Sequence, residues 1–251
     1  MKRIIPVIVI AILASAFLVK AIVNQKPISV NVPPSSAQIA ETAPPQAEPQ
    51  PETEPSDEPT TARPVKEPIR GIYATAWVSG SGRMSELIQF VKDHPKINAI
   101  VIDVKDDSGR ISYPSKVALA QAVGAGSAKF DPEKVIRLLN QHQIYPIARI
   151  VVFKDPHLAG RRPDLAVKSS AGGIWRDFKG LAWVDPYSRA VWEYNVAVAK
   201  EAAGFGFKEI QFDYVRFTSD GPIQTCRYSF SDGKSKADTI SAFLEYAYRE
   251  L

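Results

Sequence analysis

The sequence has little of what metal, disulfide or nucleic-acid chemistry requires. Its single cysteine, Cys226, leaves no partner for a disulfide within the chain. Three histidines, His94, His142 and His157, stand in unrelated contexts, and with one cysteine they cannot build a His/Cys metal centre. No run of Lys and Arg alternates with aromatic residues, and the net charge is only +4. We therefore expect no metal, no other cofactor and no nucleic-acid partner.

The N-terminus carries an apolar run behind two basic residues. The run extends from Ile4 to Val19, a pattern that directs the rest of a chain across a membrane. A snorkelling Lys20 would let it span as an anchor, whereas Ala14-Ser15-Ala16 resembles a cleavage site. We expect residues 1–24 to be a signal anchor or a signal peptide. The folded part is then extracytoplasmic, either membrane-anchored or secreted.

A Pro/Glu-rich stretch follows at residues 25–68. More than half of the 20 prolines fall between Pro27 and Pro68, and large apolar side chains are few. Such a segment cannot bury enough surface to offset the entropy of ordering, so we expect a disordered, extended linker. Residues 69–251 remain for the folded domain, enough for one hydrophobic core.

In residues 69–251, short apolar runs alternate with amphipathic helical patterns. The runs predict strands at 71–77, 99–104, 145–153 and 209–217, and 99–104 is typical of a strand buried on both faces. Helices are predicted between the strands and after the last one. Asp131-Pro132 and Asp185-Pro186 are typical helix starts.

This alternation predicts an α/β fold with parallel strands joined by right-handed crossovers. A doubly wound sheet and an eight-stranded barrel both fit the pattern. Polar residues at the carboxyl ends of the strands favour the barrel, because that rim carries active sites. We therefore expect a (β/α)8 TIM-type barrel, of which about the first four βα units are present.

Asp213 is the most informative single residue, because it interrupts an otherwise apolar strand. A carboxylate there is costly unless it is paired or hydrogen-bonded. It is either a nucleophile or electrostatic stabiliser at the rim, or a structural carboxylate held by Arg216, Arg149 or Lys105.

Other polar residues on the strands are candidates for binding sugar hydroxyls. Asp103 and Lys105 share one face of their strand by the period of two. Arg149 lies within an apolar strand and needs a carboxylate partner, for which Asp103 and Asp213 are the candidates. That pair is either part of the site or a structural clamp.

A long segment between the third strand and the next helix, residues 154–184, carries Trp175 and Trp183. Exposed over a rim, the two tryptophans would stack on sugar rings; the alternative is that they pin the loop to the barrel. Tyr73 and Trp77 on the first strand are weaker candidates for the same role.

Several segments resemble a known bacterial family. IDVKDDSGRISY at 102–113, YPIARIVVFKDPHLA at 145–159 and FKEIQFDYVRFTSDG at 207–221 are similar to a glycoside hydrolase domain family long catalogued as a domain of unknown function. The resemblance covers about 71–221. It implies a TIM-type barrel related to α-amylase- and α-galactosidase-like enzymes, with Asp213 in the place of their strand-four nucleophile. It also implies a domain that continues past this chain, with its acid/base on a later strand.

The function expected from this resemblance is hydrolysis of an envelope or extracellular polysaccharide, with Asp213 as the catalytic nucleophile. The expected ligand is a polysaccharide or oligosaccharide, and the N-terminal segment contacts the membrane. The alternatives are a non-catalytic, membrane-tethered carbohydrate-binding barrel, or an inactive truncated remnant. The residues expected to bind substrate are Asp103, Lys105, Arg149, Trp175, Trp183, Arg216, Tyr73 and Trp77.

Overall fold

The computed structural model describes residues 68–251. The signal anchor or signal peptide predicted at 1–24 lies outside the described residues, as does the linker predicted at 25–68 except for its last residue. Within residues 68–251, no helix is both long and apolar enough to cross a membrane.

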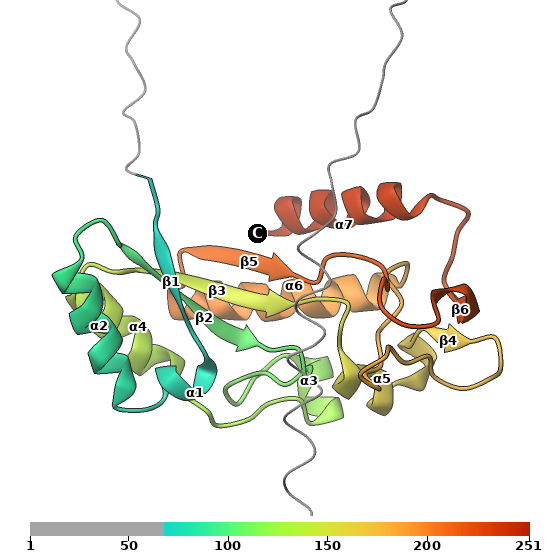
Figure 1. Cartoon of the computed structure of the whole chain (residues 1–251), viewed down its shortest axis with the longest axis horizontal. Helices are drawn as coiled ribbons and strands as arrows, with labels where there is room; N and C mark the ends of the chain where they lie inside the picture. Colours follow the sequence, from blue (N-terminus) through green and yellow to red (C-terminus); the bar gives the residue numbers. More distant parts are fainter. Residues whose placement is uncertain (1–67) are drawn as a thin grey trace, which may run out of the picture. The chain divides into compact units, whose positions relative to one another are not determined.

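A parallel four-stranded sheet forms the centre of this part of the chain (Figure 1). Its strands lie in the order β1-β2-β3-β5, with the bounds Gly71–Ala74, Ala99–Lys105, Tyr145–Val151 and Glu209–Asp213. A doubly wound sheet reverses its strand order at a switch point, whereas a barrel wall keeps the order of the sequence. The predicted α/β fold with parallel strands is confirmed, and its four strands follow the order of the sequence without a switch point.

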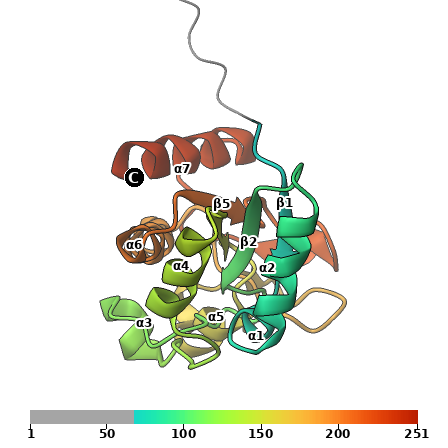
Figure 2. The ribbon, with the colours of Figure 1, turned by 90° about the vertical axis from the view of Figure 1, so that its left-hand side faces the viewer.

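Helices connect the strands and cover one face of the sheet. Helix α4 packs against β3, α6 packs against β3 and β5, and α7 lies next to α6 (Figure 2). A small antiparallel ladder of β4 and β6 joins the β3–α6 loop to the β5–α7 loop. The remaining bounds are α1 Ala76–Ser79, α2 Arg83–Asp93, α3 Ala118–Val123, α4 Pro132–Gln141, α5 Pro156–Arg161, β4 Lys168–Ser169, α6 Arg189–Phe205, β6 Cys226–Arg227 and α7 Lys236–Glu250.

The two faces of the sheet differ in what covers them. Ile100, Ile102 and Ile150 point toward the helices and are fully buried in the core. On the other face, which we call the open face, Tyr73 and Gln211 are exposed and Arg149 is half-buried. Because successive side chains alternate across a strand, this contrast follows from the register of the strands.

Three predicted strands are too long at their carboxyl ends. The strand predicted at 145–153 ends at Val151. The first ends at Ala74, because the Thr75 side chain accepts a hydrogen bond from the Val78 amide (3.3 Å) and starts α1. Trp77 therefore lies in a helix and not on a strand. The last strand ends at Asp213, because Tyr214 has a φ of +52°, which an extended strand does not allow.

One predicted helix start is confirmed and the other is wrong. Asp131 caps α4 by accepting a hydrogen bond from the Lys134 amide at 3.1 Å. Asp185 does not cap α6, which begins after Ser188. Its carboxylate instead accepts hydrogen bonds from the amides of Tyr187 (3.0 Å) and Phe230 (3.2 Å), which ties two loops together.

Candidate active site

Each strand of the sheet contributes one polar side chain to a cluster on the open face. The four are Tyr73 from β1, Asp103 from β2, Arg149 from β3 and Asp213 from β5. Asp103 is the register partner of Arg149, and Asp213 is the partner of Val151, two residues further along β3. We call these four residues the strand cluster. All four were candidates in the sequence, and the parallel sheet brings them together.

Arg149 bridges the two carboxylates of the strand cluster. Its Nη1 donates a hydrogen bond to Asp103 Oδ1 at 2.6 Å, and its Nε and Nη2 donate to Asp213 Oδ2 at 2.9 and 2.5 Å. Burial lowers the pKa of Arg149, but the hydrogen bonds to Asp103 and Asp213 outweigh burial and raise it overall. Arg149 therefore pairs with both of the carboxylates that were its candidate partners.

Asp213 is the more accessible of the two carboxylates. Its side chain is 41% exposed, whereas that of Asp103 is 7% exposed. Its Oδ1 accepts a hydrogen bond from the Tyr214 amide at 2.6 Å. The left-handed backbone of Tyr214 costs about 1–3 kcal/mol, and strain of this kind concentrates at functional sites.

Tyr73 occupies the second oxygen of Asp103. Its hydroxyl donates a hydrogen bond to Asp103 Oδ2. Burial, then this hydrogen bond, then the charge of Asp103 raise the pKa of Tyr73 from 10.0 to about 12. Asp103 therefore has one oxygen held by Arg149 and the other held by Tyr73.

We expect Tyr73 to ionise about two pH units above an ordinary phenol. With a folded-state pKa raised above its unfolded value of 10.0, the bond to Asp103 stabilises the fold fully below pH 10 and is lost as the pH rises through about 12. The measurement is the phenolate absorbance of the wild type minus that of Tyr73→Phe. A difference step centred near pH 10 would contradict the hydrogen bond.

Two further ion pairs lie beyond the carboxyl ends of β2 and β3. Lys129 Nζ lies 2.5 Å from Asp106 Oδ2, and Lys154 Nζ lies 3.1 Å from Asp107 Oδ2. Lys154 also lies 4.7 Å from the centre of the Tyr214 ring, directly beyond Asp213. Lys154 was not among the site residues predicted from the sequence, although a lysine directly after a buried strand was the available signal.

Lys105 lies on the opposite side of the sheet from the strand cluster. The register shifts between Asp103 and Lys105, so Lys105 stands opposite Ile150, a helix-facing residue. Its Nζ lies 2.7 Å from Asp155 Oδ2, and both side chains are fully buried. The expectation that Asp103 and Lys105 share one face is wrong, because a β-bulge breaks the period of two.

Trp175 and Trp183 are buried to 1% exposure, so neither ring is available to stack on a sugar. The indole of Trp175 donates a hydrogen bond to the carbonyl of Pro222 at 3.2 Å, and that of Trp183 donates to Asp177 Oδ2 at 3.2 Å. The alternative interpretation, that they hold the long loop in place, is the one the structure bears out.

Trp77 and Arg216 are both exposed, but neither joins the strand cluster. Trp77 is 69% exposed, with Lys129 Nζ 5.6 Å from its ring centre. The guanidinium of Arg216 lies 5.0 Å from the ring centre of Trp183 and 5.2 Å from that of Tyr214. Among residues 68–251, no group of three His, Cys, Asp or Glu side chains is arranged to hold a metal ion.

The fold is α/β with a parallel sheet. Its polar cluster lies toward the carboxyl ends of the strands, where proteins of this class place their sites. The family model described as "Putative glycosyl hydrolase domain" matches residues 71–251. The chain belongs to this family. No curated protein matches it.

Among solved structures, a hypothetical protein from Ruminiclostridium thermocellum is 40% identical. The alignment covers 72% of this chain and 92% of that one, with a TM-score of 0.68. The chain is also similar, at 16% identity and a TM-score of 0.48, to an α-xylosidase from a soil metagenome, covering 72% of this chain and 27% of that one. An α-galactosidase from Thermus thermophilus is 12% identical, with 75% and 37% coverage and a TM-score of 0.48.

Proposed function

We propose that this protein is a retaining glycoside hydrolase acting on an envelope or extracellular polysaccharide, with Asp213 as its nucleophile. The observation that carries the proposal is the setting of Asp213, which ends β5 on the open face with its carboxylate fixed by Arg149 and the Tyr214 amide. Membership of a glycosyl hydrolase family supports a glycosidic substrate. The proposal includes a (β/α)8 barrel, of which the sheet forms four βα units, held outside the cytoplasm by the N-terminal segment.

In this mechanism an oxygen of Asp213 attacks the anomeric carbon of the sugar and forms a glycosyl ester. A general acid protonates the leaving oxygen, and the same group then removes a proton from the water that cleaves the ester. Asp103 does not suit that second role, because its side chain is only 7% exposed, whereas that of Asp213 is 41% exposed, and Arg149 and Tyr73 hold its two oxygens. Asp103 therefore acts as a positioning residue, which holds Arg149 against Asp213.

Two exposed aromatic rings supply the sugar-binding surface on this proposal: Tyr73 in the strand cluster, and Trp77 in α1, the short helix that follows β1. Tyr73 is 52% exposed and Trp77 is 69% exposed, so their faces can stack on pyranose rings. Asp107, whose side chain is 55% exposed, offers carboxylate oxygens to sugar hydroxyls. These residues replace the buried Trp175 and Trp183 as the stacking groups.

A non-catalytic carbohydrate-binding role is the second candidate. The observation that favours it concerns Asp103, the other carboxylate of the strand cluster. Arg149 and Tyr73 hold its two oxygens, so the cluster lacks the second accessible carboxylate that hydrolysis needs as its acid/base. Such a protein would bind glycans through Tyr73 and Trp77 without cleaving them.

Mechanism-based trapping separates the two functions. The full chain is incubated with a panel of 2-deoxy-2-fluoroglycosyl fluorides, which form long-lived glycosyl esters with retaining glycosidases. The expected result is a mass increase of one sugar, mapped by peptide sequencing to Asp213. A label on another residue would overturn the assignment of the nucleophile. Glycan binding that is lost in Trp77→Ala, without any label, would establish the binding role instead.

A further inference from the structure

The loop between β3 and α6 lies beyond the carboxyl ends of β3 and β5, and it contains a β-hairpin (Figure 1). We call residues 175–183 the loop hairpin; an antiparallel bridge between Arg176 and Ala182 closes it. The loop after β5 packs directly on it, because a Cβ at Gly221 would lie 2.8 Å from Trp175 Cζ2. The loop hairpin is therefore held beside the end of the strand that carries the candidate nucleophile.

A buried carboxylate fixes the shape of the loop hairpin. Asp177 Oδ1 accepts hydrogen bonds from the amides of Lys179 and Leu181, both at 2.9 Å. Its Oδ2 accepts one from the indole of Trp183 at 3.2 Å. Gly180 completes the turn with a φ of +76°, a conformation that other residues rarely adopt. Three hydrogen bonds to one carboxylate hold the turn in a defined conformation.

The tip of the loop hairpin presents an aromatic ring to solvent. Phe178 is 79% exposed, although it directly follows the buried Asp177. Strands that continue the sheet past β5 would extend its side, whereas the loop hairpin lies beyond the strand ends, where a barrel carries its site. An exposed ring on a fixed turn beside a candidate carbohydrate site is suited to stacking on a sugar.

Three cations lie on or next to the loop hairpin. Arg176 and Lys179 belong to it, and both are exposed. Arg216, also exposed, lies with its guanidinium 5.0 Å from the ring centre of Trp183. Among residues 68–251, none of the three forms an ion pair with a carboxylate, including the exposed Asp220 in the loop after β5. These cations are available to an anion from outside the protein.

The carboxylates of the candidate site, by contrast, are already paired. Each of the four aspartates at or just after the carboxyl ends of β2 and β5 lies within 3.1 Å of a cation. The positive charge of the loop hairpin and Arg216 is therefore in excess at this end of the sheet, and it favours a negatively charged ligand. The pairs that the aspartates form are Asp103–Arg149, Asp213–Arg149, Asp106–Lys129 and Asp107–Lys154.

We propose that the loop hairpin and Arg216 form a subsite for an acidic sugar, and that the substrate is a polysaccharide containing uronic acids. Phe178 stacks on a pyranose ring, and the cations donate charge-assisted hydrogen bonds to the carboxylate that the ring carries. A neutral glycan would leave the three cations without an anion. This inference rests on the proposed hydrolase function, since it names the substrate class of that site.

The experiment measures polysaccharide binding by the full chain carrying Asp213→Asn, so that nothing is cleaved. The ligands are polygalacturonate, alginate and hyaluronan, each compared with its methyl ester by isothermal titration calorimetry. Polyglutamate serves as a polyanion that has carboxylates but no sugar rings. We expect at least one acidic polysaccharide to bind about tenfold more tightly than its ester, which lacks the charge that strengthens these hydrogen bonds. Polyglutamate should bind more weakly than that polysaccharide.

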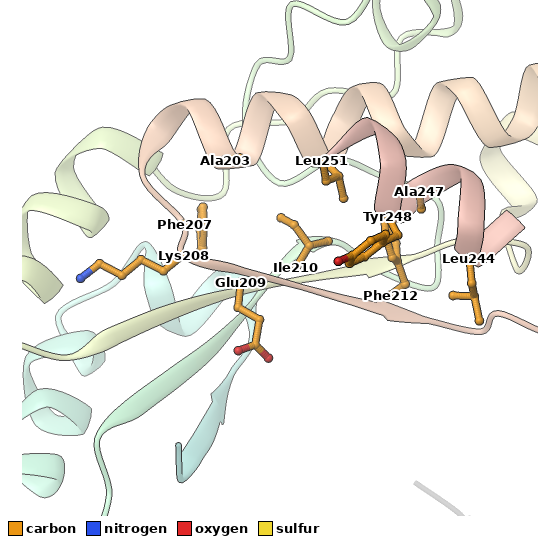
Figure 3. A pocket seen from close by; sticks show the side chains of 10 residues that line it. All are labelled: Ala203, Phe207, Lys208, Glu209, Ile210, Phe212, Leu244, Ala247, Tyr248 and Leu251. Atoms are coloured by element: carbon orange, nitrogen blue, oxygen red, sulfur yellow. The ribbon is translucent and has the colours of Figure 1, made fainter. Parts of the chain in front are cut away.

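Matched variants test the loop hairpin itself. Arg176→Gln/Lys179→Gln should weaken binding of the acidic polysaccharide about tenfold and leave binding of its ester unchanged. Phe178→Ala should weaken both by a similar factor, because stacking does not depend on the charge. The control Lys92→Gln/Lys208→Gln removes two exposed cations near the amino ends of β2 and β5 and should leave binding unchanged. Figure 3 shows Lys208 at the amino end of β5.

Three outcomes would overturn the proposal, once circular dichroism has shown that each variant is folded. The first is that no acidic polysaccharide binds more tightly than its ester. The second is that the control variant weakens binding as much as the hairpin variants do, which would show diffuse attraction between charges. The third is that polyglutamate binds as tightly as the polysaccharide. Fluorosugar labelling of Asp213 is independent of these results, so a hydrolase of neutral glycans is distinguished from a protein without hydrolase activity.

Discussion

Asp213→Asn should lower kcat by a factor of at least about 10³ and leave the protein folded. The neutral amide cannot form the glycosyl ester, so the first chemical step is lost. The fold should survive, because asparagine has the same shape, its oxygen can still accept the Tyr214 amide, and Asp103 still pairs with Arg149. The measurement is kcat on the glycoside whose fluorosugar analogue labels the enzyme.

A matched variant and a rescue experiment separate chemistry from structure. Glu209 lies four residues earlier on β5, on the same face of the strand, and is exposed. Glu209→Gln should therefore leave kcat unchanged. Azide added to Asp213→Gly should restore turnover, since the small anion can attack the anomeric carbon where the carboxylate is missing, and the product is a glycosyl azide. Activity retained in Asp213→Asn would exclude Asp213 as the nucleophile.

Lys105→Met should lower the free energy of unfolding by about 3–5 kcal/mol. The substitution removes the ammonium group and leaves the Asp155 carboxylate in a fully buried place without its counter-charge. Lys105 also donates hydrogen bonds to the Val151 carbonyl at 2.8 Å and to Asn195 Oδ1 at 3.1 Å, and both oxygens lose that donor. Urea unfolding followed by circular dichroism measures the change.

The double variant Lys105→Met/Asp155→Asn should recover part of that loss. The amide removes the buried charge, and its oxygen can still cap α5 by accepting the Leu158 amide, which lies 2.7 Å from Asp155 Oδ1. Lys200→Met is the exposed control: its pair with Glu250 is open to water, which screens it, so its effect should be far smaller. A Lys105→Met cost no larger than this control would show that the buried pair does not stabilise the fold.

The turn after β2 shows how this buried pair reaches the candidate site. Gly109 has a φ of +80°, and a Cβ there would lie 1.9 Å from Asp155 Oδ1, so the turn packs directly on the carboxylate. Asp106 lies in the same turn, where its ion pair with Lys129 lowers its pKa although burial alone would raise it. The Lys105–Asp155 pair thus supports the turn that carries Asp106 and Asp107.

The sequence by itself determined the order of the four strands of the main sheet and of the helices α2, α4, α6 and α7, because these elements depend on local patterns. The β-branched run of β2 predicted a strand buried on both faces, and only Val101 in it is half-buried. The Asp131-Pro132 pair predicted the start of α4, because its capping hydrogen bond spans only three residues. Asp103, Arg149 and Asp213 stood out because a charged residue inside an apolar run needs a partner.

Only the tertiary structure decided which of those candidates meet. Arg149 reaches both carboxylates because β2 and β5 flank β3, a neighbour relation that no local pattern contains. Lys105 left the predicted face because a bulge in the β2–β3 ladder reversed its direction, and a bulge is a property of the pairing between strands. Trp175 and Trp183 are buried because the long loop packs on itself and on the loop after β5. Side-chain direction and burial depend on contacts between segments far apart in the sequence, whereas periodicity reports only on neighbours along the chain.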